Sequence, residues 1–491
     1  MKVSNIHRQA GVLLHISSLP LGALGPSAYQ FVDFLHQVGA TVWQTLPLNM
    51  PHADGSPYQC LSAHAGNPAF ISMKILVDEK LLSAEDLTIY MTNRSPELKQ
   101  KLIEKIFIAL SKQPQSPQYL AFKKFCRKHA SWLDDFALFL LLRKQFENVS
   151  WNKWPDVYKK RDAKALNQIK KLYQDEIDEI KFTQFLFFQQ WASLKAYANQ
   201  KGVAMFGDVP IFVAYDSADV WANPELFKLD KRCNMKVVAG VPPDYFSATG
   251  QHWGNPHYNW QAMKADGFKW WLARMATQNS FFDMVRIDHF RGLQAAWEIP
   301  ANEETAINGK WKLAPGAALL EAITKRFPRM CLVAEDLGLI TPQVNALRAK
   351  FKLPGMKILQ FAFGSGDDNY YLPSNIEANS VVYTGTHDNH TTVGWYNTIE
   401  PHAKQHLHAV LAKDNPKIPA DLVQMALATK ANLAIIPMQD ILGLDGSHRM
   451  NTPGTMENNW RWHFSWPQLT LELVAQFAQA IKATGRVQVK K

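Results

Sequence analysis

The sequence predicts an α/β fold, a (β/α)8 TIM barrel, from three observations. Eight short apolar runs rich in β-branched residues, each ending in polar residues or in Gly or Pro, recur along the 491 residues. Their near-continuous apolar character is typical of strands buried on both faces of a parallel sheet. Amphipathic helical patterns, such as Ser27–Val38 and Pro342–Phe351, lie between most of these runs, so that strand and helix alternate.

The predicted strands are Gly11–Ile16, Thr41–Leu46, Val203–Phe206, Phe282–Ile287, Cys331–Ala334, Met356–Phe361, Val381–Thr384 and Ala431–Ile436. Their number matches a barrel whose active site lies at the carboxyl ends of the strands. A doubly wound sheet is the alternative, but no G-x-G-x-x-G motif follows the first run to bind a dinucleotide.

One long stretch separates the second and third predicted strands. Residues 48–202 are far too long for a single connection, and we expect them to form a mainly helical insertion subdomain. Ser95 and Pro96 mark a helix start within it, because Pro is favoured in the first turn of a helix. Further helical segments are expected at Trp132–Phe146 and Phe182–Gln200.

Residues 207–280 form a second long stretch, rich in Pro, Gly and aromatic residues and poor in helical period. We expect an active-site loop insertion there, because such loops gather at the catalytic face of a barrel. The stretch after Pro437 is too short for a C-terminal β-sandwich beside the closing helices. A single catalytic barrel is therefore expected over residues 1–491.

Composition argues against several classes of protein. The chain is 47% apolar and 20% charged, as expected of a compact fold with a substantial core. Its formal charge of +10 comes from scattered lysines without an Arg-rich run, so we expect a solvated basic face and no nucleic-acid partner. No apolar run approaches the roughly 20 residues of a membrane span, and no membrane partner is expected. Four widely spaced cysteines and the lack of a recognisable signal peptide favour free thiols and a cytoplasmic location.

Three carboxylate-bearing stretches follow predicted strands in order. They are Val285–His289, Ala334–Leu337 and Thr386–Asn389, and they carry the acids Asp288, Glu335 and Asp388. Because a parallel barrel brings the carboxyl ends of its strands to one face, we expect the three acids to share one pocket. Such a pocket predicts an enzyme that acts on glycosidic bonds.

The first two acids fit a retaining mechanism. Residues two apart on a strand share a face, so Arg286 lies beside Asp288 and favours the ionised form that a nucleophile requires. Glu335 ends an apolar strand, where burial favours the protonated form that can donate to a leaving oxygen. Retaining glycosyl transfer needs such a pair, with the carboxyl groups about 5 Å apart. A structural ion pair at Asp288 and a charged strand cap at Glu335 are the alternatives.

The third acid, Asp388, has His387 beside it, and the two suit hydrogen bonds to the hydroxyls of a sugar ring. The alternative is a loop aspartate that makes a local turn. His387 and His390 have the H-x-x-H spacing of metal ligands, but no third ligand is evident, so that neither a metal nor a cofactor is expected.

Longer motifs carry a family resemblance. The segments VRIDHFRG (Val285–Gly292), VAEDLG (Val333–Gly338) and THDNHT (Thr386–Thr391) resemble the nucleophile, acid/base and third-carboxylate motifs of the α-amylase clan. The signature GVPPDYFSATGQHWGNPHYNW (Gly240–Trp260) resembles glycoside hydrolase family 77, the 4-α-glucanotransferases or amylomaltases, rather than an amylase. Further matches are Ser56–Gln59, Ala65–Pro68, Gly207–Pro210, Pro437–Asp440, Arg449–Asn451 and Pro453–Thr455. The similarity covers essentially the whole chain, except that His52–Gly55 replaces a loop with glycine and tyrosine, which weakens the inference of a secondary glucan-binding platform there.

The resemblance implies an α-retaining double displacement through a covalent glycosyl-enzyme intermediate. Asp288 would be the nucleophile, Glu335 the acid/base and Asp388 the stabiliser of a distorted sugar. By the same resemblance, the substrate-binding residues are Tyr58, Asp208, Gln251, Trp253, Arg286, His289 and His387. Tyr58 would stack on a sugar ring, and Gln251 and Trp253 would belong to a loop over the cleft.

The implied partners are maltooligosaccharides and soluble α-glucans as donors, with glucose or a maltooligosaccharide as acceptor; the sequence does not indicate an oligomeric state. A hydrolase stays an alternative, because water can resolve the same intermediate and the residues alone do not separate the two outcomes. A catalytically silent glucan-binding protein on the same barrel is a second alternative, and its expected mark would be the loss of one acid.

Overall fold

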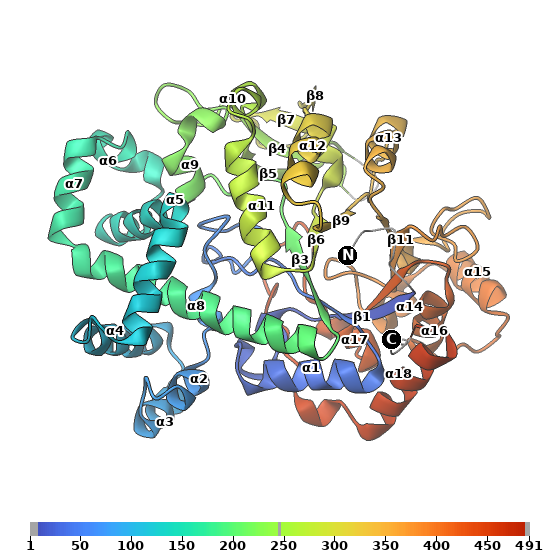
Figure 1. The fold of residues 1–491 in the computed structure, drawn as a ribbon. Helices are drawn as coiled ribbons and strands as arrows, with labels where there is room; N and C mark the ends of the chain where they lie inside the picture. Colours follow the sequence, from blue (N-terminus) through green and yellow to red (C-terminus); the bar gives the residue numbers. More distant parts are fainter. Residues whose placement is uncertain (1–7, 244–246, 487–491) are drawn as a thin grey trace.

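Eight parallel strands form one sheet that curls into a barrel (Figure 1). The computed structural model describes residues 8–243 and 247–486. The strands are β1 (Gln9–Leu13), β2 (Val42–Gln44), β3 (Ala204–Val209), β6 (Met284–Ile287), β9 (Cys331–Ala334), β10 (Gly355–Ile358), β11 (Ser380–Tyr383) and β12 (Leu433–Pro437). They pair in the order β10-β11-β12-β1-β2-β3-β6-β9. All eight predicted strands are confirmed, and the fold is a (β/α)8 barrel.

The interior of the barrel is filled by alternate residues of its strands. One packed apolar cluster draws on all eight strands through Leu13, Val42, Phe206, Met284, Val333, Met356, Val381 and Leu433. Their neighbours in sequence, such as Val12, Trp43 and Val285, belong instead to the larger core beneath the helices. Each strand is therefore buried on both faces, which explains why the sequence shows continuous apolar runs rather than alternation.

Helices connect and cover the strands. The longer ones after successive strands are α1 (Pro26–Val38), α8 (Gln174–Gln200), α11 (Lys269–Phe281), α12 (Gly316–Arg326), α13 (Pro342–Lys350), α16 (Ala420–Ala428) and α18 (Leu471–Ala483). The loops after β11 and β12 also carry α14 (Thr392–Thr398), α15 (Pro401–Leu411) and α17 (Met438–Ile441). The ends of α1 follow local chemistry, because Pro26 occupies its first turn and Gly39 ends it with a left-handed φ of 80°.

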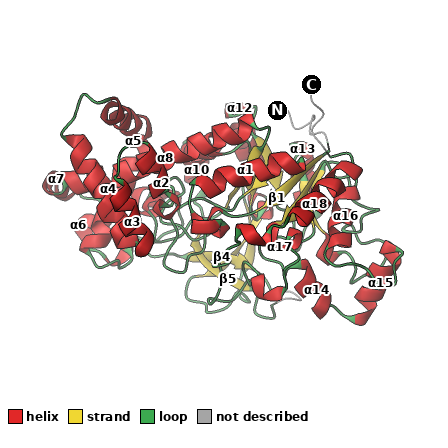
Figure 2. Ribbon diagram, turned by 90° about the horizontal axis from the view of Figure 1, so that it is seen from below, coloured by secondary structure: helices red, strands yellow, loops and turns green. Residues whose placement is uncertain are grey.

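Residues between β2 and β3 are mostly helical. They form α2 (Met73–Asp78), α3 (Ala84–Thr92), α4 (Pro96–Ser111), α5 (Pro117–Gln145), α6 (Asp156–Lys159), α7 (Ala163–Leu172) and then α8. Both views place α4, α6 and α7 to one side of the barrel strands (Figures 1 and 2). The predicted start at Ser95 is confirmed, since its hydroxyl accepts the Leu98 N–H. Helix α5 begins well before Trp132, because Ser116 and Pro117 provide another start signal of the same kind.

Residues 207–280 are less loop-like than the sequence suggested. They contain α9 (Ala218–Ala222), β4 (Val237–Val241), β5 (Gln251–Pro256), α10 (Trp260–Ala265) and α11. Helix α11 was not anticipated, because its buried residues include polar ones such as Arg274 and Gln278 and leave no one-sided apolar stripe. Residues 244–246 of the predicted signature lie outside the described residues. The division of the chain into one barrel with two insertions stays a prediction.

A small antiparallel sheet lies beside the barrel. It pairs β5 and β4 with β7 (Ala295–Pro300) and β8 (Lys310–Leu313), in the order β5-β4-β7-β8. Figure 2 shows β4 and β5 apart from β1. The described residues after Pro437, up to position 486, contain no strand. No helix within the described ranges is long and apolar enough to cross a bilayer.

Gly207 on β3 offers a test of the barrel packing. A Cβ atom at this position would lie 2.1 Å from Cδ2 of Phe282, so that Gly207→Ala must displace a buried ring. We expect a loss of about 1–3 kcal/mol in the free energy of unfolding, measured by urea denaturation. Gly364→Ala is the matched control, because an added Cβ there meets nothing within 4 Å. A Gly207→Ala midpoint equal to that of the wild type would contradict this packing.

Candidate active site

Strand register brings the predicted acids to the same end of the barrel. Asp208 on β3 pairs directly with Arg286 on β6. Ile287 of β6 pairs with Ala334 of β9, so the next residues, Asp288 and Glu335, leave neighbouring strands at the same level. The backbone N–H of Glu335 donates to the Ile287 carbonyl at 3.1 Å, which fixes this level. This register places Asp288 and Glu335 next to each other, and a pocket shared by all three acids stays a prediction.

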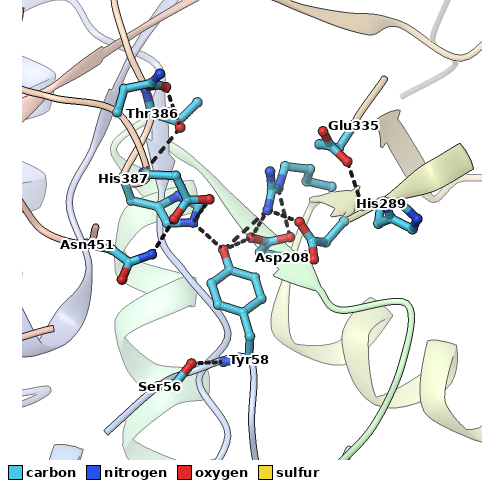
Figure 3. A network of polar contacts seen from close by, with 12 residues as sticks. Ser56, Tyr58, Asp208, His289, Glu335, Thr386, His387 and Asn451 are labelled. Atoms are coloured by element: carbon cyan, nitrogen blue, oxygen red, sulfur yellow. Dashed lines mark hydrogen bonds and ion pairs between the residues drawn. The ribbon is translucent and has the colours of Figure 1, made fainter. Parts of the chain in front are cut away.

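Arg286 is the centre of a polar network that includes Tyr58 and Asp208, both labelled in Figure 3. Its Nε donates to Asp208 Oδ1 at 2.9 Å, and its Nη2 donates to Asp288 Oδ1 at 2.6 Å. The Asp208 side chain is 0% exposed and that of Arg286 only 4%, so this ion pair is excluded from water. The Asp288 side chain, by contrast, is 30% exposed. Arg286 therefore orients both carboxylates at once.

The Tyr58 hydroxyl links Arg286 to the third acid. It donates to Asp208 Oδ2 at 2.6 Å, lies 2.8 Å from His387 Nε2, and accepts from Arg286 Nη2 at 3.2 Å. The rings of Tyr58 and His387 are stacked with centroids 5.4 Å apart. Figure 3 shows Tyr58 between Asp208 and His387. The loop that carries Tyr58 is thus part of the site although it precedes the helical segment.

Asp388 is held by groups from two segments. His387 Nε2 lies 3.2 Å from its Oδ2, and Asn451 Nδ2 donates to its Oδ1 at 2.6 Å. The Asp388 N–H also donates to the Thr386 hydroxyl at 3.3 Å, so this local turn is made by the side chain of Thr386 and not by that of Asp388. Asn451 was only part of a quoted motif, and nothing in its surroundings in the sequence marks it as a partner of Asp388. Its contact spans 63 positions.

Glu335 accepts two backbone hydrogen bonds. The His289 N–H donates to Oε2 at 2.7 Å, as Figure 3 shows, and the Leu337 N–H donates to Oε1 at 3.2 Å. His289 has a left-handed φ of 50°, which lets its N–H point at Glu335 while its side chain lies elsewhere. No cationic side chain contacts Glu335 within hydrogen-bond distance in the described part of the chain.

The environment separates the pKa values of the acids. Burial raises the pKa of Glu335 to about 8, and the nearby charge of Asp288 adds to this. Burial also raises the pKa of Asp288, but the Arg286 guanidinium opposes it and the value is about 6. Burial disfavours ionised Asp388 too, yet His387 and the Asn451 amide outweigh it and hold that pKa well below its usual range. The surroundings of Asp388 therefore favour the ionised form, and those of Glu335 favour the protonated form more strongly than those of Asp288.

Gln251 and Trp253 lie on β5 of the small sheet. Trp253 Nε1 donates to Gln251 Oε1 at 3.0 Å. The Trp253 ring meets the His289 ring edge-on, with centroids 4.8 Å apart. Gln59 Nε2, next to Tyr58, donates to the Trp253 carbonyl at 3.3 Å. Trp253 is thus connected to the site twice: through His289, whose N–H bonds Glu335, and through Gln59, which follows Tyr58. Gln251 is connected through its bond to Trp253.

Two residues that lie near Asp388 and Tyr58, Arg449 and Trp460, were not predicted as site residues. Arg449 donates to the Asp388 carbonyl, and the Trp460 ring lies 5.9 Å from that of Tyr58. Arg449 belongs to the family motif Arg449–Asn451, whereas Trp460 has no signal beyond being one of many aromatic residues. Within the described residues, no group of three or more His, Cys, Asp or Glu is placed to hold a metal ion.

A (β/α)8 barrel with two carboxyl groups at neighbouring strand ends is typical of enzymes that act on glycosidic bonds. The family model described as 4-alpha-glucanotransferase, glycoside hydrolase family 77, matches residues 14–470. The chain belongs to this family.

Individual relatives agree with this assignment. A 4-alpha-glucanotransferase from Thermus thermophilus is 43% identical over 496 residues, which cover 98% of this chain and 99% of that protein. Another from Synechocystis sp. is 44% identical over 495 residues, which cover 98% of each chain. The solved amylomaltase from Streptococcus agalactiae in complex with acarbose has a TM-score of 0.93 and 34% identity, over 98% of this chain and 100% of that one.

The buried ion pair of Arg286 can be tested through stability. Arg286→Met leaves the fully buried Asp208 carboxylate without a cation, and we expect a loss of about 3–5 kcal/mol in the free energy of unfolding. Adding Asp208→Asn should recover part of that loss, because the uncompensated charge is removed. Arg127→Met, at an exposed position of α5, is the control. An Arg286→Met variant with the urea midpoint of the wild type would show that the pair is not formed.

Proposed function

We propose that this protein is a 4-α-glucanotransferase that transfers α-1,4-glucan segments between maltooligosaccharides. The observation that carries the proposal is the pair Asp288 and Glu335, which occupy adjacent strand ends with pKa values of about 6 and about 8. Membership of the 4-alpha-glucanotransferase family supports the substrate class. The Streptococcus agalactiae amylomaltase, whose structure contains acarbose, supports an α-glucan in the cleft.

In the first half-reaction, ionised Asp288 attacks the anomeric carbon of the donor sugar. The bond from that carbon to the glycosidic oxygen breaks, and protonated Glu335 gives its proton to the departing oxygen. A covalent glycosyl ester on Asp288 results, and Glu335 becomes ionised. Arg286 holds Asp288 Oδ1 at 2.6 Å, so that the other oxygen is left for the attack.

In the second half-reaction, ionised Glu335 removes a proton from a hydroxyl of the acceptor sugar. The acceptor oxygen forms the new bond to the anomeric carbon, the ester on Asp288 breaks, and both acids return to their starting states. Two inversions at the same carbon retain the α-configuration. Water in place of the acceptor would give hydrolysis.

The remaining site residues suit binding and stabilisation of the sugar. Asp388, held by His387 and Asn451, would bond hydroxyls whose interactions strengthen as the ring flattens. His289 Nε2 is buried and has no hydrogen-bond partner among the described residues, so it is available to a sugar hydroxyl. Asp208 and Tyr58 would border the reacting sugar.

Trp253 and Gln251 on β5 would cover the cleft from the small sheet, where Trp253 meets His289. A cover of this kind favours transfer, because it limits the access of water to the intermediate. Maltooligosaccharides as donors and glucose or a maltooligosaccharide as acceptor, like the cytoplasmic location, are part of this proposal.

Incubation with maltotriose tests the proposed function. We expect free glucose and oligosaccharides longer than maltotriose, resolved by length over time, without a rise in total reducing ends. Asp288→Asn serves as the inactive control, since it lacks the nucleophile. Shorter products alone with rising reducing ends would make the protein a hydrolase, and an unchanged substrate would favour a glucan-binding protein.

The pH profile of kcat/KM should be bell-shaped. Activity falls below the Asp288 pKa of about 6, because protonation removes the nucleophile. It also falls above the Glu335 pKa of about 8, because ionisation removes the proton donor. Initial rates of glucose release from maltotriose between pH 4 and 10 measure both limbs. Activity that rises steadily through pH 9 would contradict the role of Glu335 as the acid.

A further inference from the structure

The barrel sheet has a seam between β9 and β10. Seven parallel ladders join the eight strands, and within the described residues no ladder joins β9 to β10. One backbone hydrogen bond spans this gap, from the Ala334 N–H to the Pro354 carbonyl at 2.9 Å. Glu335 directly follows Ala334, the donor of this bond. The position of a proposed catalytic acid is therefore set where the sheet has the fewest backbone bonds.

The side chain of Asp336 fills the seam. Its Oδ1 accepts the Met356 N–H of β10 at 2.7 Å, as a strand carbonyl would. Its Oδ2 lies 3.3 Å from Arg348 Nε of α13, and the side chain is only 4% exposed. Position 355 has no room for a side chain, since a Cβ there would lie 2.3 Å from Asp336 Oδ2. The end of β9, strand β10 and helix α13 thus meet at this one carboxylate.

We propose that Asp336 is a positioning residue for Glu335, which it holds in place by closing the barrel between β9 and β10. The proposal rests on the proposed function, in which Glu335 is the acid/base. Asp336 lies between Glu335 and Leu337, whose N–H donates to Glu335 Oε1 at 3.2 Å. A shift of Asp336 therefore moves both the backbone of Glu335 and a hydrogen-bond donor to its carboxyl group.

Charge is a second link between the two residues. After burial and Asp288, the negative charge of Asp336 contributes to the raised pKa of Glu335. The other charged or titratable groups that face these two acids include Arg286 on β6, Asp288 directly after β6, Arg348 on α13, Lys357 on β10, and Tyr370 and Tyr371 in the loop after β10. Burial raises the pKa of Asp336 itself, while Lys357, the Met356 N–H and Arg348 favour its ionised form. Asp336 thus helps to keep Glu335 protonated.

Two variants separate charge from geometry. Asp336→Asn keeps an oxygen that can accept the Met356 N–H but removes the charge. We expect the basic limb of kcat/KM on maltotriose to move to lower pH by about one unit, because an ionised neighbour no longer opposes ionisation of Glu335. Gly355→Ala keeps the charge and displaces the carboxylate. It should lower kcat about tenfold or more, with KM changed far less, because Glu335 is moved away from the leaving oxygen.

A donor whose leaving group needs no proton separates a failure of this proposal from a failure of the proposed function. The fluoride of α-maltotriosyl fluoride departs without a proton, so glycosylation of the enzyme bypasses the acid. Glu335→Gln should lose transfer from maltotriose but still release fluoride; full activity of Glu335→Gln on maltotriose would overturn the proposed function. If Glu335→Gln behaves as expected, a wild-type basic limb in Asp336→Asn and a wild-type kcat in Gly355→Ala would overturn the role of Asp336 alone.

Asp219→Asn is the matched control for loss of a buried carboxylate. Asp219 is 5% exposed and accepts the Ala63 N–H at 2.7 Å, far along the chain from Glu335. The Asp219→Asn substitution should lower the stability of the protein without moving the basic limb of the pH profile of kcat/KM. If Asp336→Asn fails to fold, Gly355→Ala decides the matter: a reduced kcat on maltotriose with fluoride release retained supports the positioning role, and a wild-type kcat overturns it.

Discussion

The buried guanidinium of Arg286 is the interaction on which the rest of the site depends. Asp208 and Asp288 project from neighbouring strands, and Asp208 has no access to water. Two carboxylates in such a place would repel each other and lose their hydration without a shared cation. Arg286 supplies that cation from β6, the strand that Asp288 follows, and also bonds the Tyr58 hydroxyl. Asp288, the proposed nucleophile, is thereby fixed relative to Asp208 and the Tyr58 ring.

The same cation explains why the two proposed catalytic acids, Asp288 and Glu335, differ in pKa. Asp288 contacts Arg286 directly, whereas Glu335 accepts hydrogen bonds only from backbone N–H groups. Two acids also lie near Glu335: Asp336, which follows it in sequence, and Asp288, at the end of the neighbouring strand. Burial acts on both, so the difference in pKa comes from their partners. This division is what a double displacement needs, since one acid must be ionised and the other protonated at the same pH. The barrel register makes it possible, because both leave their strands at one level.

Much of the fold and the site could be predicted from the sequence, because the signals are local or repetitive. All eight strands showed as apolar runs, and Asp288 and Glu335 directly follow two of them. Helix α11 escaped because its polar residues are buried, so that the usual one-sided pattern is lost. Asn451 and Arg449 escaped as partners of Asp388 because they lie some 60 positions away in a segment without regular structure. The bond from Met356 to Asp336 likewise depends on how the barrel closes, which no short pattern encodes.

The most direct test of the account is to locate the covalent bond to the sugar. In Glu335→Gln, α-maltotriosyl fluoride can still glycosylate the enzyme, but the intermediate lacks the base that an acceptor hydroxyl needs, so it should accumulate. Mass spectrometry of the intact protein should show one added maltotriosyl group, and peptide mapping should place it on Asp288. A sugar attached to any other residue, or fluoride release without a trapped ester, would contradict the assignment of Asp288 as the nucleophile.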